Sequence, residues 1–372
     1  MTQTMKAFVL HEGRGRFEER PLPKAGPTDV IVRATAVSAC SAELACLSGE
    51  FPAAEGTVLG HEGVGVVHEV GSLVTEFEVG QRVTTASTTP CGICANCQRG
   101  FSGHCRQAVW GGYTFGVSRD GTFAEYFTVP QAGYNVVSIP DKVSDAAALC
   151  ITDTIASGST GVEAAQPPLG SVIVVFGQGH IGLGATATAR AVGAALVITV
   201  KSRPGGEHIA KALGADFSFN LADHDVQAEI RDLTGGLGAD VVIEATGARA
   251  SFPMAVEATR EGGVLAVLSA YDGPADAALE IPLAHWGWGI GDKTILSTFQ
   301  RCGSERMGRL LRLVETGRID PTPLLTRTYG FGDLPRALAD LKARPTGHIK
   351  PLITFEPASF QDEFETTQGV EL

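Results

Sequence analysis

The fold class is decided by the run Ser171-Val172-Ile173-Val174-Val175-Phe176-Gly177-Gln178-Gly179-His180-Ile181-Gly182. Its first half is continuously apolar, which is typical of a strand buried in a parallel sheet. Its second half is a G-x-G-x-x-G turn, followed by the helix-like residues 183–192 and a second apolar strand, 195–200. A lone G-x-G-x-x-G is a weak signal, but strand, turn, helix and strand in this order predict a dinucleotide-binding unit.

The glycines of the turn have separate physical tasks in such a unit. Gly177 allows the tight turn, Gly179 lets the backbone approach a pyrophosphate, and Gly182 lets the helix pack closely on the strand. Unpaired N–H groups at the start of the helix then face the phosphates. We therefore predict a cofactor-binding turn made of Gly177, Gly179, His180, Ile181 and Gly182.

The end of the second strand predicts which dinucleotide binds. An acidic residue at this point would hydrogen-bond the ribose diol of NAD. The sequence instead has Lys201-Ser202-Arg203-Pro204, and cations beside a hydroxyl suit a 2′-phosphate. We predict NADP(H), bound by Lys201, Ser202 and Arg203. The alternative is a solvated basic loop on an acidic protein.

The pattern of strands and helices divides the chain into three segments. Residues 156–296 alternate strands and helices, as in a doubly wound parallel sheet, with further elements at 207–213, 240–244, 253–260, 264–268 and 293–297. Residues 1–155 carry short strands between Pro- and Gly-rich turns and predict an all-β, barrel-like region with strands at 7–10, 30–34, 64–70, 82–85 and 126–129. Two helices and a strand, at 304–316, 334–341 and 347–353, are expected to fold back onto the first segment.

Composition limits the classes of function. The chain has 372 residues, of which 44% are hydrophobic and 19% charged, and this suits two globular domains. A net charge of −12 argues against sequence-independent nucleic-acid binding, which needs a basic surface. No apolar run is long enough to span a membrane, and no signal-peptide pattern precedes the first strand. We expect a cytoplasmic protein that binds neither nucleic acid nor membrane, with an acidic mobile tail at 356–372.

Four cysteines give the strongest metal signal. They follow the pattern C-x2-C-x2-C-x7-C and are Cys91, Cys94, Cys97 and Cys105. In a cytoplasmic protein, cysteines serve as metal ligands or core residues more often than as disulfides. Four close thiolates suit a closed tetrahedral zinc site, which is structural because it has no open position. A disulfide cluster and an iron–sulfur site are the alternatives, and we expect the neighbouring His104 to be a bystander.

A second metal signal lies in Leu59-Gly60-His61-Glu62-Gly63-Val64-Gly65. Adjacent strand residues face opposite sides of a sheet, but the flanking glycines loosen the backbone. On its own the pair would be an ordinary strand-edge histidine and a solvated glutamate. Upstream, Cys40 is a candidate thiolate ligand; downstream, Asp153 ends an apolar helix, where an uncompensated carboxylate is costly. Cys150, one turn earlier, is the rival of Asp153.

Together these segments resemble the zinc-containing medium-chain alcohol dehydrogenase family, over nearly the whole chain to about Phe355. The narrower resemblance is to bacterial NADP-dependent secondary alcohol dehydrogenases, and it is carried by residues 60–62, 152–153, 202–204, 286–289 and 293–295. It implies an α/β protein in which a GroES-like β-barrel catalytic domain, 1–155 and 297–372, contains a structural zinc lobe at about 88–108. A doubly wound Rossmann domain, 156–296, is inserted into it. The resemblance also implies a homodimer or homotetramer.

The resemblance further implies roles for single residues. The catalytic zinc is expected on Cys40, His61 and Asp153, with Glu62 as a fourth, exchangeable ligand. This makes two Zn²⁺ per chain. Lys350 falls at the position of a basic contact to the cofactor phosphates. Alignment also places five residues near the substrate pocket: Ser87, Thr88, Tyr113, Tyr271 and Phe299.

Two departures from the family pattern matter. The four-cysteine lobe is complete here, whereas the bacterial branch often lacks it. The family normally has Ser or Thr two residues after the ligand cysteine, and often His three further on, but this chain has Ala42 and Ala45. A methyl group cannot relay a proton. Ser41, Glu62 or a water molecule would then carry the proton, so Ser41 and Glu62 are our candidate catalytic residues.

The sequence predicts zinc-dependent hydride transfer between NADP(H) and an alcohol, ketone or aldehyde. The missing relay leaves one enzymatic alternative, reduction of an iminium or an activated C=C bond, in which no alcohol proton moves. A third hypothesis comes from another class of function, a weakly catalytic NADP(H)-binding sensor or structural subunit.

Overall fold

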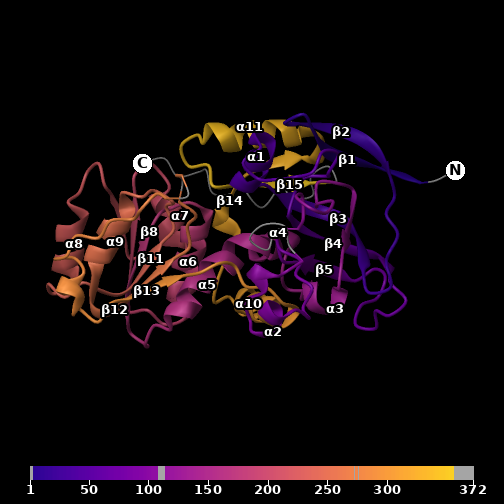
Figure 1. Cartoon of the computed structure of the whole chain (residues 1–372). Helices are drawn as coiled ribbons and strands as arrows, with labels where there is room; N and C mark the ends of the chain where they lie inside the picture. The colour runs from indigo at the N-terminus through magenta and orange to yellow at the C-terminus, as the bar shows by residue number, and fades with distance from the viewer. Residues whose placement is uncertain (1–2, 108–113, 272, 275, 356–372) are drawn as a thin grey trace, which may run out of the picture.

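The computed structural model describes the chain except for residues 1–2, 108–113, 272, 275 and 356–372. Tyr113 and the predicted tail at 356–372 lie outside the described residues. Figure 1 shows two lobes side by side, and the N-terminal and C-terminal parts of the described chain share one of them. Among the described residues, no helix is both long and apolar enough to cross a membrane.

The lobe formed by the middle of the chain contains a sheet of six parallel strands, in the order β10-β9-β8-β11-β12-β13. They are β8 (Val172–Phe176), β9 (Leu196–Lys201), β10 (Phe217–Asn220), β11 (Ala239–Glu244), β12 (Thr259–Val267) and β13 (Thr294–Ser297). The helices are α6 (His180–Ala191), α7 (Glu207–Ala212), α8 (Val226–Leu233) and α9 (Ser251–Ala258), with the 3₁₀ turn η3 (Gly287–Gly289). The predicted strand–turn–helix–strand unit is therefore confirmed as β8, α6 and β9. The edge strand β10 and helix α8 were not predicted.

A seven-stranded sheet organises the second lobe, in the order β14-β15-β3-β4-β5-β7 with β6 paired to β3. Its strands are β3 (Val30–Ser38), β4 (Glu62–Val70), β5 (Arg82–Thr85), β6 (Tyr126–Val129), β7 (Val136–Ser138), β14 (Leu325–Gly330) and β15 (Lys350–Thr354). A hairpin of β1 (Thr4–His11) and β2 (Arg14–Pro21) packs onto the same core. The helical pieces are α1 (Ser41–Ser48), α2 (Ala95–Gln98), η1 (Ser102–His104), α3 (Ala132–Asn135), α10 (Ser304–Glu315), η4 (Thr322–Leu324), η5 (Phe331–Asp333) and α11 (Leu334–Ala343).

The last strand returns to the N-terminal sheet, as the sequence predicted. β15 pairs antiparallel with β3, with Ile353 opposite Val37. Phe331 and Leu338, from the same C-terminal segment, are buried in one cluster with Phe8 and other N-terminal residues. Because β3 also pairs with β4, this return brings the start of β15 close to the start of β4.

A continuous helical segment links the two lobes. It begins as α4 (Asp145–Cys150), capped by Ser144, whose Oγ accepts the N–H of Ala147 at 3.2 Å. It then widens into a π-helical turn, η2 (Ile151–Ile155), and continues as α5 (Ala156–Ala165). The apolar helix expected to end at Asp153 therefore does not end there. Single π turns within helices are frequent at functional sites because they redirect one side chain.

Helix α6 packs unusually closely on this segment. A Cβ atom at Gly158 of α5 would lie 2.3 Å from the backbone N of Ala185, and one at Gly184 would lie 2.2 Å from the carbonyl O of Thr154. Backbone atoms cannot yield as a flexible side chain can, so glycine is required at both crossings. The contact fixes the start of α6 relative to the turn that carries Asp153.

We expect Gly158→Ala and Gly184→Ala each to lower the free energy of unfolding by about 1–3 kcal/mol or more, because overpacking forces the two helices apart. Gly308→Ala in α10 is the matched control, since its Cβ would meet its nearest neighbour at 3.7 Å. A helical Gly→Ala change without a clash stabilises by up to about 1 kcal/mol. Thermal unfolding of the three variants measures this, and equal melting temperatures would contradict the packing argument.

Candidate active site

Four of the predicted ligands meet in one buried cluster. One donor atom each from Cys40, His61, Glu62 and Asp153 lies within 4.8 Å of all the others. His61 Nε2 is 3.4 Å from Cys40 Sγ, 3.7 Å from Glu62 Oε1 and 3.8 Å from Asp153 Oδ2. All four side chains are buried. A thiolate, an imidazole and carboxylates at this spacing fit a zinc ion.

The ligands come from the ends of separate elements. Cys40 is the N-cap residue of α1, and Asp153 projects from the π-helical turn η2. Gly60 has a φ of +95°, and His61 follows it just before β4, which begins at Glu62. Because His61 precedes the regular strand, strand alternation does not send it and Glu62 to opposite faces.

Glu43 is a functional residue that the sequence analysis missed. Its Oε1 lies 2.5 Å from His61 Nδ1, and its Oε2 accepts the backbone N–H of Cys40 at 2.8 Å. A carboxylate in this position fixes the orientation of the imidazole and leaves Nε2 for the metal. The available signal was a glutamate three residues after the helix-capping position, the spacing of a capping box. Here the capping residue is the ligand Cys40.

The surrounding charges shift the ionisation of the cluster. Burial raises the pKa of the Cys40 thiol, but the neighbouring His61 brings that pKa below its ordinary value. Burial also raises the pKa of Asp153, yet the nearby imidazoles of His180 and His61 hold that pKa well below its ordinary range. Burial lowers the pKa of His61, while Glu43 and Cys40 raise it well above its usual value. A metal ion binds the neutral imidazole, so metal binding and protonation compete at His61.

Lys350 lies against the metal cluster. Its Nζ donates to Oε1 of Glu62, and its side chain is buried. Burial lowers the pKa of Lys350, but the charge of Glu62 outweighs this and raises that pKa above its ordinary value. The ammonium group thus compensates a fully buried carboxylate, which alone would be strongly unfavourable. A contact between Lys350 and cofactor phosphates stays a prediction.

Two other candidates are not among the four donor atoms. The thiol of Cys150 contacts the carbonyl O of Pro321 at 3.5 Å, so Asp153 and not its rival joins the cluster. Ser41 is exposed at the first position of α1, whereas Ala42 beside it is buried. A proton-relay role for Ser41 stays a prediction.

The described residues predicted near the substrate pocket have different neighbours. The backbone N–H of Ser87 donates to the carbonyl O of Thr152 at 3.0 Å, and its Oγ lies 2.6 Å from Oε1 of Gln300. Thr88 is buried against Cys302, with 2.5 Å between Oγ1 and Sγ. Tyr271 instead donates its hydroxyl to the buried Glu244 at 2.7 Å. Pocket roles for these residues and for Phe299 stay predictions.

The four remaining predicted thiol ligands form a second cluster, also within 4.8 Å. Cys94 Sγ and Cys97 Sγ are 3.5 Å apart, and the backbone N–H of Cys91 donates to Cys105 Sγ at 3.4 Å. None of the four is in a disulfide. Backbone hydrogen bonds from Arg106 and Cys97 lower the pKa of the Cys94 thiol to about 6. The arrangement fits a closed zinc site, and His104 is not among its four donors, in agreement with the prediction.

The glycine turn between β8 and α6 fits a dinucleotide. Gly177 has a φ of +106°, and a Cβ at Gly182 would lie 1.9 Å from the carbonyl O of Gly177. A Cβ at Gly179 would meet nothing within 4 Å, and no side chain caps this end of α6. The first N–H groups of the helix therefore face open space, where an anionic phosphate is favoured.

The three predicted phosphate-binding residues at the end of β9 differ in what they can contact. Lys201 is buried, and its Nζ is bonded to the Glu207 carboxylate and, at 3.1 Å, to the carbonyl O of Gly205. Ser202 and Arg203 are exposed. The charge of Lys201 is thus largely compensated within the protein, which leaves Arg203 as the cation of this group that can reach a 2′-phosphate.

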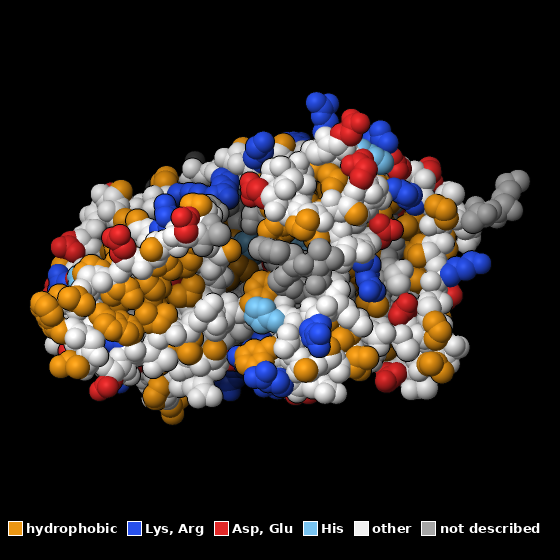
Figure 2. Space-filling model, in the orientation of Figure 1, with side chains coloured by type: hydrophobic (Ala, Val, Ile, Leu, Met, Phe, Trp, Pro, Cys, Tyr) orange, Lys and Arg blue, Asp and Glu red, His pale blue; other side chains and the backbone are white. Residues whose placement is uncertain are grey.

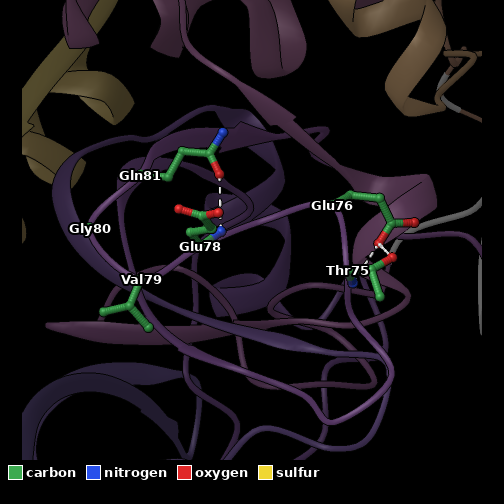
Figure 3. Close-up of a pocket in the computed structure, with 6 residues that line it drawn as sticks. All are labelled: Thr75, Glu76, Glu78, Val79, Gly80 and Gln81. Atoms are coloured by element: carbon green, nitrogen blue, oxygen red, sulfur yellow. Dashed lines mark hydrogen bonds between the residues drawn. The ribbon is translucent and has the colours of Figure 1, made fainter.

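A surface hollow lies apart from these groups, in the loop between β4 and β5 (Figure 3). Its lining consists of Thr75, Glu76, Glu78, Val79, Gly80 and Gln81. The polar groups of this lining bond one another: Gln81 Oε1 accepts the N–H of Glu78 at 3.2 Å, and Glu76 accepts the N–H of Thr75 at 3.0 Å. We assign it no role.

Comparison with known proteins agrees with this geometry. The family profile described as "Alcohol dehydrogenase GroES-like domain" matches residues 26–141, and "Zinc-binding dehydrogenase" matches residues 181–316. An alcohol dehydrogenase of Cupriavidus necator is 37% identical, in an alignment that covers 90% of this chain and 94% of that protein. An NADP-dependent isopropanol dehydrogenase of Thermoanaerobacter brockii is 36% identical over 94% of this chain and 99% of its own length.

A solved structure extends the likeness to the fold. The alcohol dehydrogenase of Thermus sp. ATN1 superposes with a TM-score of 0.85 and 27% identity, over 94% of this chain and 99% of that chain. The likeness spans both lobes, the GroES-like part and the six-stranded Rossmann sheet, and the two thiolate-containing clusters lie in the described residues. The chain therefore belongs to the zinc-containing medium-chain alcohol dehydrogenase family.

Proposed function

We propose that this enzyme transfers a hydride between NADP(H) and a small alcohol or the corresponding ketone or aldehyde. The observation that carries the proposal is the buried set of Cys40, His61, Glu62 and Asp153, whose donor atoms lie within 4.8 Å of one another. The glycine turn that suits a dinucleotide leads into helix α6, and α6 packs against the π-helical turn η2, which carries Asp153. The isopropanol dehydrogenases among the relatives support NADP(H) and a secondary alcohol.

When bound, zinc would polarise the substrate oxygen as a Lewis acid, and nicotinamide would supply or accept the hydride. Cys40, His61 and Asp153 would hold the metal, with Glu62 as the exchangeable fourth ligand. Glu43 keeps the imidazole of His61 in the orientation that presents Nε2. Lys350 compensates Glu62 while this carboxylate is buried and not bound to metal. The second cluster, of four thiolates, would hold a structural zinc.

The proton of the alcohol needs a separate acceptor in this chain. Ala42, at the position of the family's hydroxyl relay, is buried and has no group that exchanges protons. Glu62 remains a candidate, because its carboxylate belongs to the donor cluster and contacts Thr152 Oγ1 at 3.4 Å. The absence of a hydroxyl at Ala42 also favours the second candidate reaction, reduction of an iminium or activated C=C bond, in which no alcohol proton moves. Product analysis with a ketone and an enone separates the two reactions.

A homo-oligomer is part of the proposal. In the segment before the edge strand β13, Leu283, Trp288 and Ile290 expose 61%, 73% and 85% of their surface. Figure 2 shows hydrophobic side chains gathered on the lobe that holds the parallel sheet. Apolar surface of this kind marks interaction sites, and a second copy of the chain would cover it.

Domain boundaries at 155/156 and 296/297 and a cytoplasmic location stay predictions.

We expect Cys40→Ala and His61→Ala each to reduce kcat/KM by at least about 10³-fold, because they remove ligands that hold the Lewis acid. Zinc content should fall from two per chain to one, while the melting curve keeps its cooperative shape. Cys46→Ala is the control, since it removes another buried thiol from α1 that is outside the cluster. Full turnover by a Cys40→Ala enzyme that has lost this zinc would overturn the proposed chemistry.

Cys97→Ala should remove the other zinc and lower the melting temperature, because a structural site couples metal binding to folding. The segment that carries the four cysteines also contacts a distant part of the chain, because Ser102 Oγ accepts the N–H of Cys302 at 2.6 Å. Metal analysis and thermal unfolding measure both effects. Unchanged zinc content in Cys97→Ala would show that the four thiols do not hold a metal.

Arg203→Ala should raise the KM for NADP(H) by about 10- to 100-fold and leave the KM for NAD(H) nearly unchanged. The loss corresponds to charge-assisted hydrogen bonds of about 1.5–3 kcal/mol, at about 1.4 kcal/mol for each factor of ten. Arg231→Ala, an exposed arginine of α8 that pairs with Glu257, is the control. A wild-type enzyme that prefers NAD(H) would refute the assignment of Ser202 and Arg203.

A further inference from the structure

His180 connects the two halves of the active site. It is the first residue of α6, directly after the N-cap Gly179, and thus belongs to the glycine turn. Its imidazole nevertheless turns away from that turn, with Nε2 at 3.6 Å from Asp153 Oδ2. Burial lowers the pKa of His180, but the neighbouring Asp153 and Cys40 raise it to about 9. One residue therefore has its backbone at the phosphate-binding turn and its side chain on two of the predicted metal ligands.

The packing of the helices places the backbone of His180 beside the turn that carries Asp153. Gly184, one turn further along α6, presses against the carbonyl O of Thr154, the residue after Asp153. Since neither backbone can shift without the other, the start of α6 and the π-helical turn η2 keep a fixed separation. The imidazole spans this separation. It does not belong to the group of mutually close donor atoms, so it acts on Asp153 as a neighbour and not as a fifth ligand.

The opposite oxygen of Asp153 is held as well. Ser157 Oγ donates to Asp153 Oδ1 at 2.8 Å, and His180 faces Oδ2. A carboxylate ligand whose oxygens are both oriented by neighbours is pre-organised for a metal, and losing such a partner typically costs 10- to 100-fold in metal affinity. Ser157 lies on α5, in the linking helical segment. Of Ser157 and His180, only His180 belongs to α6, the helix whose N-terminus would meet the cofactor phosphates.

We propose that His180 is a positioning residue that couples cofactor binding to retention of the catalytic metal. The inference rests on the proposed function. A phosphate bound at the N-terminus of α6 would order the turn that carries His180, and an ordered His180 would hold Asp153 in its ligand geometry. Coupling between two sites is reciprocal, so the metal would in turn strengthen cofactor binding. The G-x-G-x-x-G pattern leaves position 180 open to any residue, so the coupling depends on the side chain that this chain has there.

The test is the rate at which a chelator removes zinc from the holoenzyme, with and without saturating NADP⁺. The phase that is absent in Cys40→Ala identifies the catalytic zinc, and the four-cysteine zinc serves as an internal reference. In the wild type, NADP⁺ should slow the catalytic phase by about tenfold, within the usual range of coupling between sites. Fluorescence titration with NADPH, run in parallel, reports cofactor binding independently of turnover.

Two variants remove the contact and one restores it. His180→Leu lacks a donor, and His180→Asn is too short to reach Asp153; both should lose the catalytic zinc about tenfold faster without cofactor and gain less than twofold protection from NADP⁺. His180→Gln, whose amide can take the place of Nε2, should recover most of the protection. The four-cysteine phase should stay the same throughout. Mere steric shielding by NADP⁺ would protect every variant equally.

The outcomes separate this inference from the proposed function. Normal NADPH binding with wild-type protection of zinc in both His180→Leu and His180→Asn would overturn the coupling and leave the proposed function intact. Failure of the wild-type enzyme to bind NADPH or NADH would overturn the cofactor assignment, and this inference with it. Loss of protection in His180→Gln as well as in His180→Leu would assign the effect to the imidazole ring itself and exclude hydrogen bonding as its cause.

Discussion

The buried ion pair between Lys350 and Glu62 is the interaction on which the active site depends. The cluster brings Glu43, Glu62 and Asp153 together with the thiol of Cys40, all away from water. Carboxylates buried without compensation would strongly oppose folding. Lys350 supplies the compensating charge from the last strand of the described chain. The C-terminal segment must therefore return to the N-terminal sheet before the ligands can be buried, which ties the metal site to the topology of the whole lobe.

Close packing of glycines sets the relation between the two lobes. Gly158 and Gly184 allow α5 and α6 to approach at backbone distance, and α6 is also the first helix of the parallel sheet. The helix that would bind the cofactor and the turn that holds Asp153 are thus parts of one packed unit. This arrangement can hold a hydride donor and a polarised substrate oxygen in a fixed relation, which is how such enzymes lower the barrier to transfer.

Prediction from sequence succeeded where the signal is local. The apolar strand and G-x-G-x-x-G turn at 171–182 fix the β8–α6–β9 unit, and the cysteine spacing at 91–105 fixes the second cluster. It failed where partners are distant in sequence or the signal is short. Strand β10 is a four-residue edge strand, and the π-helical turn at 151–155 looks like ordinary helix in the sequence. The part played by Glu43 depends on His61, which comes from another element.

By itself, the sequence determined the fold class and the four-cysteine ligand set, because periodicity, glycine spacing and cysteine spacing act over a few residues. The ligands of the other metal cluster were implied by the resemblance to the family. Only the tertiary structure decided between Asp153 and Cys150, turned Lys201 inward onto Glu207, and set Lys350 against Glu62. It also turned His180 from the glycine turn toward Asp153. These choices depend on which buried charges meet, and that is fixed by strand pairing and helix packing between segments far apart in the chain.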